Sequence, residues 1–178
     1  MLRKSIVAAS LVALALSSAA VQAQDKPAAD KDSQKFISNA IEGDIGEVDA
    51  GQLAQQKGKS EAVKQYGAML VRDHGAHKDK AIAVANQLGV KSPTGSSVSA
   101  KATYLKLKVL SGDTFDRSFA RSMVSDHQAD IKMYQAQSAK NDAAGQLAKE
   151  TLPILQHHLQ EAQALVRETT TTGQSSKQ

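Results

Sequence analysis

The stretch SEAVKQYGAMLVRDHGAHKDKAIAVANQLG (residues 60–89) decides the fold class of this chain. One set of its residues recurs at alternating spacings of four and three, which is the periodicity of a single α-helical face. The set comprises Val63, Gly67, Leu70, His74, His77, Ala81, Val84 and Leu88. Ser60 supplies an N-cap before this face and Gly89 a stop after it. The stretch therefore predicts one long helix that packs against neighbours along its whole length.

Three further stretches carry the same periodicity and predict long helices, at about residues 33–57, 113–141 and 142–167. A shorter helix is expected at about residues 101–112. Pro153 falls inside the last long stretch and is expected to kink it or to mark a fresh first turn. Four amphipathic helices of this length predict an all-α fold, a four-helix bundle spanning residues 33–168.

The connection between the second and third long helices is itself informative. Residues 89–100 are rich in Gly, Ser and Pro and read as a connection, which the short helix then prolongs. The roughly 23 residues available could cross the full length of a bundle, at about 3.3 Å per extended residue. Both a crossover and an ordinary up-down-up-down arrangement are therefore compatible with the sequence.

The chain begins with the features of a secretory signal peptide at residues 1–23. A basic start at Arg3 and Lys4 precedes an apolar run and a set of small residues ending at Ala23. We therefore expect a periplasmic or secreted protein, with a polar leader at residues 24–32 and a disordered, low-complexity tail at residues 169–178. The apolar run is too short to span a bilayer. Any association of the mature chain with the envelope would then be peripheral, without an integral span.

Composition excludes several classes of function. The chain has no cysteine, which rules out disulfides, thiolate metal sites and a lipid-anchored cysteine. Its formal charge of +4 includes the two basic residues of the signal peptide, so the mature chain carries only about +2. Basic and acidic residues alternate without a basic block, and nucleic acid is not an expected partner. The oligomeric state is left open.

Each long helix interrupts its apolar stripe with two polar residues spaced i, i+3, so that both face the same way. These pairs are Asp44 with Glu47, His74 with His77, His127 with Asp130, and His158 with Glu161. Counted from the turn near residue 59, the first two pairs lie about 15 residues, or roughly 22 Å, along the helices. The other two pairs lie at a similar distance from the turn near residue 142. All four pairs are thus expected at one level of the bundle.

Imidazoles and carboxylates that converge in a dry core must be paired or bind a metal ion. Histidine with carboxylate in a bundle core suits Fe, Mn, Zn or Cu. The leading candidate ligands are Glu47, His74, His127 and His158. The alternates are Asp44, His77, Asp130 and Glu161. Buried histidine–carboxylate pairing without a metal is the rival interpretation.

The chain also contains an internal similarity. YGAMLVRDHGA (66–76) aligns without a gap with FARSMVSDHQA (119–129), and each places a histidine eight residues after an aromatic residue. Asp73 and Asp126 precede these histidines and lie beside the packing face. We expect them to pair with arginines or to orient a histidine.

Three segments of the chain resemble a known bacterial family. They are EGDIGEVDAGQLAQQKGKSEAVKQYGAMLVRDHGAHKDK (42–80), LSGDTFDRSFARSMVSDHQADIKMY (110–134) and LPILQHHLQEAQAL (152–165). The chain is similar over about residues 34–166 to the family called domain of unknown function 4142, often labelled a predicted outer-membrane protein. The resemblance implies an exported bundle with a ferritin-like fold and no settled activity. The sequence departs from the ferritin di-iron pattern, which has Glu-x-x-His where this chain has His-x-x-Glu.

The sequence contains no Gly-rich phosphate loop, serine elbow or catalytic cysteine, and it predicts no catalytic residue. Three functions stay open at this point. The first is a binding or envelope-stress protein with a metal in the bundle core, and the second is a metal-dependent oxidoreductase acting on oxygen species. The third is a metal-free structural or partner-binding bundle.

Overall fold

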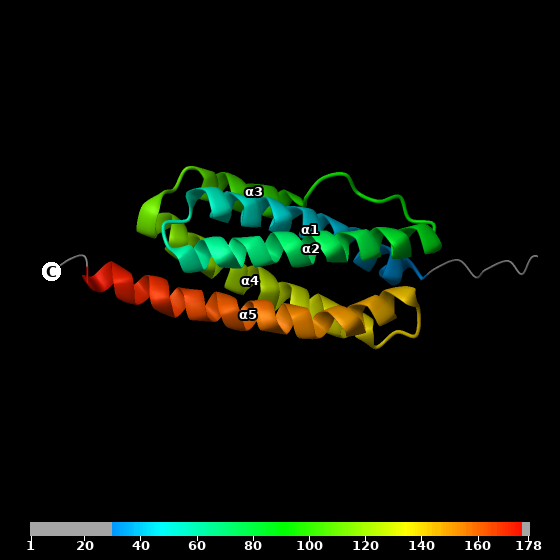
Figure 1. Cartoon of the computed structure of the whole chain (residues 1–178). Helices are drawn as coiled ribbons and strands as arrows, with labels where there is room; N and C mark the ends of the chain where they lie inside the picture. Colours follow the sequence, from blue (N-terminus) through cyan, green and yellow to red (C-terminus); the bar gives the residue numbers. More distant parts are fainter. Residues whose placement is uncertain (1–29, 176–178) are drawn as a thin grey trace, which may run out of the picture.

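The computed structural model describes residues 30–175, and every element in that range is a helix (Figure 1). The helices are α1 (Lys31–Lys57), α2 (Glu61–Gln87), α3 (Val98–Lys108), α4 (Gly112–Ser138) and α5 (Ala143–Ser175). The predicted all-α class is confirmed. The predicted signal peptide, residues 24–29 of the predicted leader and residues 176–178 of the predicted tail lie outside the described residues.

The four long helices form two antiparallel hairpins, α1 with α2 and α4 with α5, and a crossover joins them (Figure 1). After α2 the chain returns through α3, along the outside of α1, before α4 begins. Lys57 at the end of α1 donates to the carbonyl of Lys108 at the end of α3. The backbone N–H groups of Lys59 and Ser60 donate to Asp116 in the first turns of α4. The second hairpin therefore starts at the end of the bundle where the first hairpin turns, and α2 and α4 run in the same direction.

Asp116 ties this end of the bundle together. Its carboxylate oxygens accept from the backbone nitrogens of Lys59 at 2.9 Å and Ser60 at 2.8 Å, and its side chain is only 3% exposed. These two N–H groups lie in the α1–α2 turn, where no helical carbonyl can accept from them. One side chain of the second hairpin thus caps the turn of the first.

Replacing Asp116 with Ala is expected to lower the free energy of unfolding by about 1–3 kcal/mol, because two N–H groups lose their acceptor in a part-buried turn. Asp113→Ala is the matched control. Asp113 forms an exposed ion pair with Lys59 at 2.9 Å, and its loss should cost no more than about 1 kcal/mol. Urea unfolding followed by circular dichroism measures both. Equal losses in the two variants would contradict the capping role of Asp116.

The interior consists of two apolar clusters with a polar layer between them. The cluster near the α1–α2 turn is built around Leu53, Leu70, Phe115, Phe119 and Leu165. The cluster at the other end is built around Phe36, Ile37, Ile41, Tyr134 and Leu155. Along each long helix, the polar pair identified from the sequence lies between the residues of the two apolar clusters. The predicted common level of the polar residues is therefore the boundary between the two clusters.

The helices of the first hairpin approach most closely at two glycines. A Cβ built on Gly67 would lie 2.6 Å from the carbonyl oxygen of Gly51 and 2.9 Å from the Cβ of Ala54. A Cβ on Gly51 would meet the carbonyl oxygen of Gly67 at 2.6 Å. Both contacts are with atoms that cannot rotate away. The periodic stripe includes these glycines because the backbones of α1 and α2 touch there.

Gly67→Ala is therefore expected to lower the free energy of unfolding by about 1–3 kcal/mol, since the added methyl group forces the two helices apart. Gly75→Ala in the same helix is the control, because a Cβ there meets no heavy atom within 4 Å. That change should instead stabilise by about 0.5–1 kcal/mol through helix propensity. Chemical denaturation measures the two values, and a neutral Gly67→Ala would refute the close contact.

Several helix boundaries differ from the prediction. Lys31 and Asp32, placed in the polar leader, belong to α1, whose N-cap is Asp30. The short helix α3 begins at Val98 and ends at Lys108, earlier than expected. Helix α5 is continuous through Pro153, which is exposed, so no new helix starts there.

The prediction of a disordered tail from Thr169 was wrong for residues 169–175, which continue α5. Thr169 extends the buried stripe one turn beyond Leu165, and its hydroxyl donates to the Leu165 carbonyl at 2.7 Å. Thr170 and Thr171 bond back in the same way, to carbonyls one turn earlier. The hydroxyl groups are thus satisfied within the helix. Across residues 30–175, no helix combines the length and apolar character needed to cross a bilayer.

Candidate metal centre

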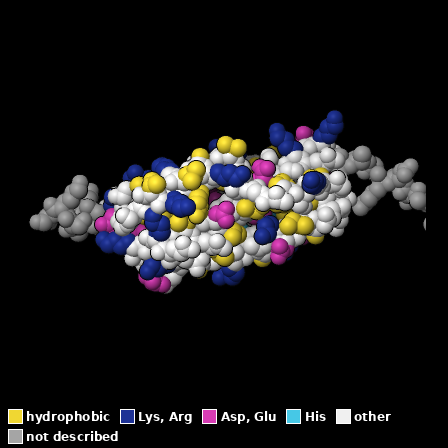
Figure 2. Space-filling view, turned by 90° about the horizontal axis from the view of Figure 1, so that it is seen from above, with side chains coloured by type: hydrophobic (Ala, Val, Ile, Leu, Met, Phe, Trp, Pro, Cys, Tyr) yellow, Lys and Arg dark blue, Asp and Glu magenta, His cyan; other side chains and the backbone are white. Residues whose placement is uncertain are grey.

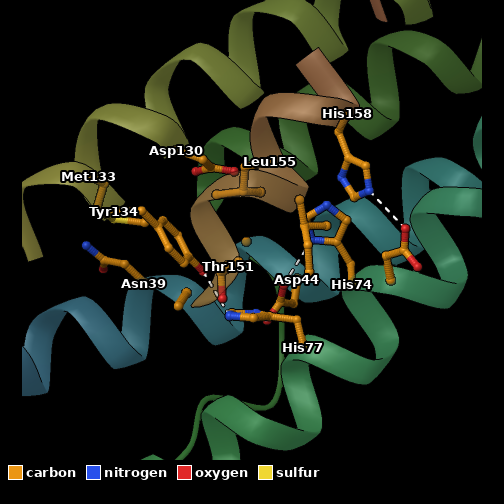
Figure 3. A pocket seen from close by; sticks show the side chains of 14 residues that line it. Asn39, Asp44, His74, His77, Asp130, Met133, Tyr134, Thr151, Leu155 and His158 are labelled. Atoms are coloured by element: carbon orange, nitrogen blue, oxygen red, sulfur yellow. Dashed lines mark hydrogen bonds and ion pairs between the residues drawn. The ribbon is translucent and has the colours of Figure 1, made fainter. Parts of the chain in front are cut away.

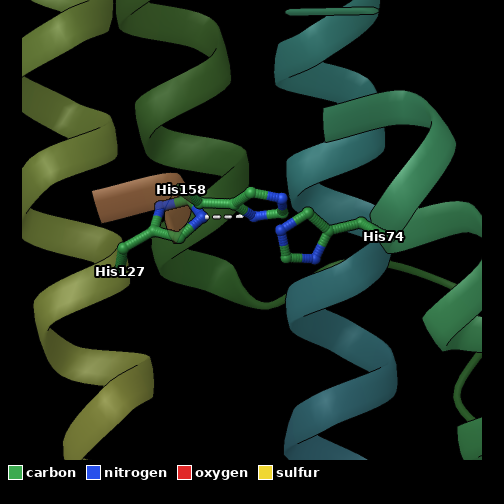
Figure 4. A group of neighbouring side chains, drawn as sticks. All are labelled: His74, His127 and His158. Atoms are coloured by element: carbon green, nitrogen blue, oxygen red, sulfur yellow. Dashed lines mark hydrogen bonds between the residues drawn. The ribbon is translucent and has the colours of Figure 1, made fainter. Parts of the chain in front are cut away.

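Three histidines from three helices meet in the polar layer. His74 of α2, His127 of α4 and His158 of α5 each offer a nitrogen, and these nitrogens lie within 4.8 Å of one another (Figure 4). The ring centroids are 5.3 to 5.7 Å apart. His127 and His158 are fully buried, and His74 is 5% exposed. We call these three side chains the histidine cluster.

The outer nitrogen of each ring has a fixed acceptor. His127 Nδ1 donates to the Met123 carbonyl at 2.9 Å, one helical turn earlier. His74 Nδ1 donates to Asp44 Oδ1 of α1 at 2.9 Å. His158 Nε2 donates to Asp73 Oδ2 of α2 at 3.0 Å. A carbonyl or carboxylate behind each ring fixes its tautomer and orients it, as is usual for metal-binding histidines.

The inner nitrogens then present lone pairs to one another. His127 Nε2 and His158 Nδ1 lie 3.3 Å apart, and His74 Nε2 is buried with no hydrogen-bond partner among the described residues. Burial lowers the pKa of His127 to about 3 and that of His158 to about 4, so both rings are neutral near pH 7. With their protons on the outer nitrogens, two lone pairs face each other without a hydrogen between them. Such a contact is repulsive unless a cation lies between the nitrogens.

Asp44 links the histidine cluster to a second histidine on α2. Its Oδ2 accepts from His77 Nδ1 at 2.7 Å, and the Tyr134 hydroxyl lies 3.5 Å from His77 Nε2 (Figure 3). His77 therefore has partners on both sides and does not face the cluster. A cavity of about 20 Å³, room for one water molecule or one ion, lies against Asp44, His74 and His158.

The structure brings together some of the predicted candidates and separates others. The predicted opposition of Asp44 with His74, and of His127 with His158, is present as direct contacts. Glu47 lines a different cavity, beside α3, and Asp130 lies between the two cavities. Neither Glu47 nor Asp130 belongs to the group of candidate ligand atoms that lie within 4.8 Å of one another.

The inclusion of Glu161 in the core layer was wrong, because its side chain is exposed. Three residues along a helix correspond to about 300° of rotation and four to about 400°, so both positions lie near His158 but on opposite sides of it. Helix α5 buries the i+4 position, Ala162, and leaves the i+3 position in solvent. His157 is exposed, because it precedes His158 by one residue and so points about 100° away from the packing face.

Carboxyl groups in this layer are strongly affected by burial. Glu47 is 6% exposed and its Oε2 has no hydrogen-bond partner among the described residues. Burial, and then the nearby Asp130, Asp126 and Asp44, raise its pKa well above the usual value. Burial also raises the pKa of Asp130 to about 6. These acids hold their protons more tightly than exposed ones.

Sequence reasoning missed two backbone contacts at the site. One is the Met123 carbonyl behind His127, and the other is the Tyr66 hydroxyl, which donates to the His158 carbonyl at 3.1 Å. Asp73 was assigned as a partner of an arginine or a histidine, and it binds both Arg72 and His158.

The internal similarity contained a signal for this geometry. The equivalent aromatic residues Tyr66 and Phe119 touch edge to face, with ring centroids 6.0 Å apart. The equivalent histidines His74 and His127 lie 5.7 Å apart. The aligned aromatic and histidine positions of α2 and α4 therefore lie near each other across the interior.

Fold and site together define a class of protein: an all-α bundle in which a crossover joins two helical hairpins around a core layer of histidines and carboxylates. The chain belongs to the family described as "Domain of unknown function (DUF4142)", whose model matches residues 17–165. The resemblance seen in the sequence is thereby confirmed at the level of the family.

Comparison with solved structures gives a match to the crystal structure of a DUF305 fragment from Deinococcus radiodurans, with a TM-score of 0.72. The match covers 80% of this chain and 99% of the fragment at 13% sequence identity, so it shows the fold alone. No curated protein sequence matches the chain.

Proposed function

We propose that this protein binds one transition-metal ion through the histidine cluster. The ligand atoms are His74 Nε2, His127 Nε2 and His158 Nδ1. The observation that carries the proposal is the buried His74 Nε2, which has no hydrogen-bond partner in residues 30–175 and lies beside the neighbouring nitrogens of His127 and His158. A metal ion would satisfy all three nitrogens at once.

The donor set narrows the choice of metal. Three neutral imidazoles suit Zn, Cu and Fe, whereas Mn favours oxygen ligands and fits least well among the four metals expected from the sequence. Three protein ligands also leave a coordination position for water or substrate, the arrangement found in catalytic zinc sites. That position is what the oxidoreductase alternative would require, and a metal-dependent redox signal of the loaded protein would support it.

The proposal includes the location of the protein. We infer that it acts outside the cytoplasm, as a metal-binding protein of the cell envelope. The basic start, the apolar run and the small residues that end at Ala23 support export. A fractionation experiment on the producing cell, with the protein followed by antibody, tests this. Recovery in the cytoplasmic fraction with an uncleaved N-terminus would overturn it.

Elemental analysis after equilibrium dialysis tests metal binding. The mature protein, dialysed against Zn²⁺ or Cu²⁺, is expected to retain about one ion per chain. His127→Gln and His158→Gln should abolish retention, and His157→Gln should not, because His157 is exposed beside the cluster. Absence of metal from the unaltered protein, or equal retention in all variants, would favour the metal-free bundle.

A further inference from the structure

A second cavity lies next to the histidine cluster, between α1, α4 and the start of α3. Three carboxylates line it, those of Glu47, Asp126 and Asp130, together with Ser97 and Ser99 of α3. We call it the acidic cavity. Its volume is about 160 Å³, several times the roughly 10–15 Å³ that one water molecule requires on the same measure. A divalent cation with part of its hydration shell fits this space.

Glu47 distinguishes this cavity from an ordinary acidic surface. The side chain is almost fully buried and lines the cavity, and its Oε2 has no hydrogen-bond partner among the described residues. Asp126 is only half-buried, so the cavity reaches solvent on that side. A buried carboxylate without a partner is unfavourable unless it meets a cation or keeps its proton.

The acidic cavity and the small cavity beside the histidine cluster share two lining residues, Gly43 and Asp130. Asp130 thus presents a carboxylate at the boundary. Gly43 leaves that boundary open, since a Cβ built there would meet no heavy atom within 4 Å. His74 and His158 line the small cavity on the far side of this boundary.

We propose that the acidic cavity is the route by which a divalent metal ion reaches the histidine cluster, passing Asp130 and the open space at Gly43. This proposal rests on the proposed function. The carboxylates attract the hydrated ion and hold it through oxygen, and the three imidazoles then bind it through nitrogen. Electrostatic focusing by a cavity of one charge sign raises the association rate of an oppositely charged ligand.

The charge of the cavity is tested by the rate of metal loading. Cu²⁺ is mixed with the mature protein, and quenching of tyrosine fluorescence reports binding near Tyr66, whose hydroxyl bonds the His158 carbonyl. Glu47→Gln combined with Asp126→Asn is expected to slow loading by about tenfold or more. Added salt should slow metal loading of the unaltered protein and have less effect on the double variant, because two of the three cavity carboxylates that salt screens are gone.

The control for charge is Asp79→Asn, which removes an exposed carboxylate of α2. It should leave both the rate and its salt dependence unchanged. If the double variant loads slowly but its loading rate keeps the full salt dependence, a structural change rather than the lost charge has slowed loading. That result would overturn the proposal. An unchanged loading rate in the double variant would overturn it as well.

The passage itself is tested by Gly43→Leu, which fills the open space at the boundary. We expect a loss of loading rate of about tenfold or more, with one ion still bound at equilibrium. Gly75→Leu is the matched control, because it adds the same side chain to a helical glycine that also has open space around it. Equal rates for the two variants would contradict the route.

These results separate the route from the site. If all variants bind one ion at equal rates, the route is wrong and the histidine cluster still stands. If the unaltered protein binds no ion, the proposed function fails first, and the route fails with it.

A separate observation concerns the outer face of α3. Its apolar side chains Val98, Ala102, Leu105 and Val109 follow a spacing of four, three and four, and all are exposed. Val98 is 85%, Leu105 63% and Val109 82% exposed, and the other exposed large hydrophobic side chain of the described residues, Ile154, lies on α5. Figure 2 looks down on this side of the molecule, where apolar side chains lie beside basic side chains.

The charges on α3 indicate what covers this face. Lys101, Lys106 and Lys108 flank the apolar side chains, and residues 98–108 contain no acidic residue. Two copies of α3 would bring lysines against lysines, which opposes self-association. An anionic lipid surface complements both features, since it accepts apolar side chains and attracts each lysine by about 1 kcal/mol. We infer that α3 docks this protein peripherally on an anionic lipid surface.

Co-sedimentation with vesicles tests the inference. The mature protein is expected to bind phosphatidylcholine vesicles that contain phosphatidylglycerol, and to bind pure phosphatidylcholine several-fold more weakly. Replacing Val98, Leu105 and Val109 with Ser should abolish binding, and Ile154→Ser should leave it intact. Absence of vesicle binding overturns the inference, as does a concentration-dependent oligomer lost in the triple variant, which would assign the face to a second copy.

Discussion

A saturating transition-metal ion is expected to raise the free energy of unfolding by about 4 kcal/mol when free metal is 1,000-fold above its dissociation constant. The three proposed ligands come from α2, α4 and α5, and so from both hairpins. The unfolded chain cannot hold them together, so the ion binds the folded state alone. Urea unfolding of the protein, with Zn²⁺ and then with a chelator, measures the gain.

Variants assign this gain to the histidine cluster. His157→Gln is expected to keep it, because that side chain is exposed. His127→Gln should lose it and unfold at the same urea concentration with and without metal. The comparison is made within each variant, so a general loss of stability in His127→Gln does not affect it. A full gain in His127→Gln would contradict the assignment of His127 as a ligand.

Glu47→Gln is expected to stabilise the metal-free protein at pH 8 and to have much less effect on its stability at pH 4. Burial and the neighbouring carboxylates raise the pKa of Glu47 in the folded state above its value in the unfolded chain. The folded protein therefore holds this proton more tightly, and its stability falls as pH rises from about 4.5 towards the folded pKa. Glutamine has nearly the same shape and does not ionise, so it avoids this loss.

Urea unfolding between pH 4 and pH 8 measures the effect, with Glu150→Gln as the control. Glu150 is exposed on α5 and bonds Gln146 at 2.8 Å, so its replacement should change stability by less than about 0.5 kcal/mol at any pH. A Glu47→Gln gain of equal size at pH 4 and pH 8 would indicate packing rather than ionisation. The expected gain also means that the natural chain keeps a carboxyl here against its own stability, which is common at functional sites.

Much of the fold could be predicted because helical periodicity is a local property. The alternation through residues 60–89 predicts a packed helix, and counting from the turns predicted that Asp44 opposes His74 and that His127 opposes His158. A rise of 1.5 Å per residue is the same in every α-helix, so level within a hairpin follows from sequence distance alone. The sequence could not choose between crossover and up-down-up-down, because a connection of that length permits both.

The sequence by itself determined the all-α class, the four long helices, the family and the level at which the histidines lie. Only the tertiary structure decided which side chains share a space at that level. It placed Glu47 in the acidic cavity and Glu161 in solvent, although both occupy the same kind of position in the pattern. Periodicity gives the angle of a side chain around its own helix, to within about a third of a turn. Whether that angle meets a cavity, another helix or water depends on how the neighbouring helices are rotated, and their packing sets that rotation.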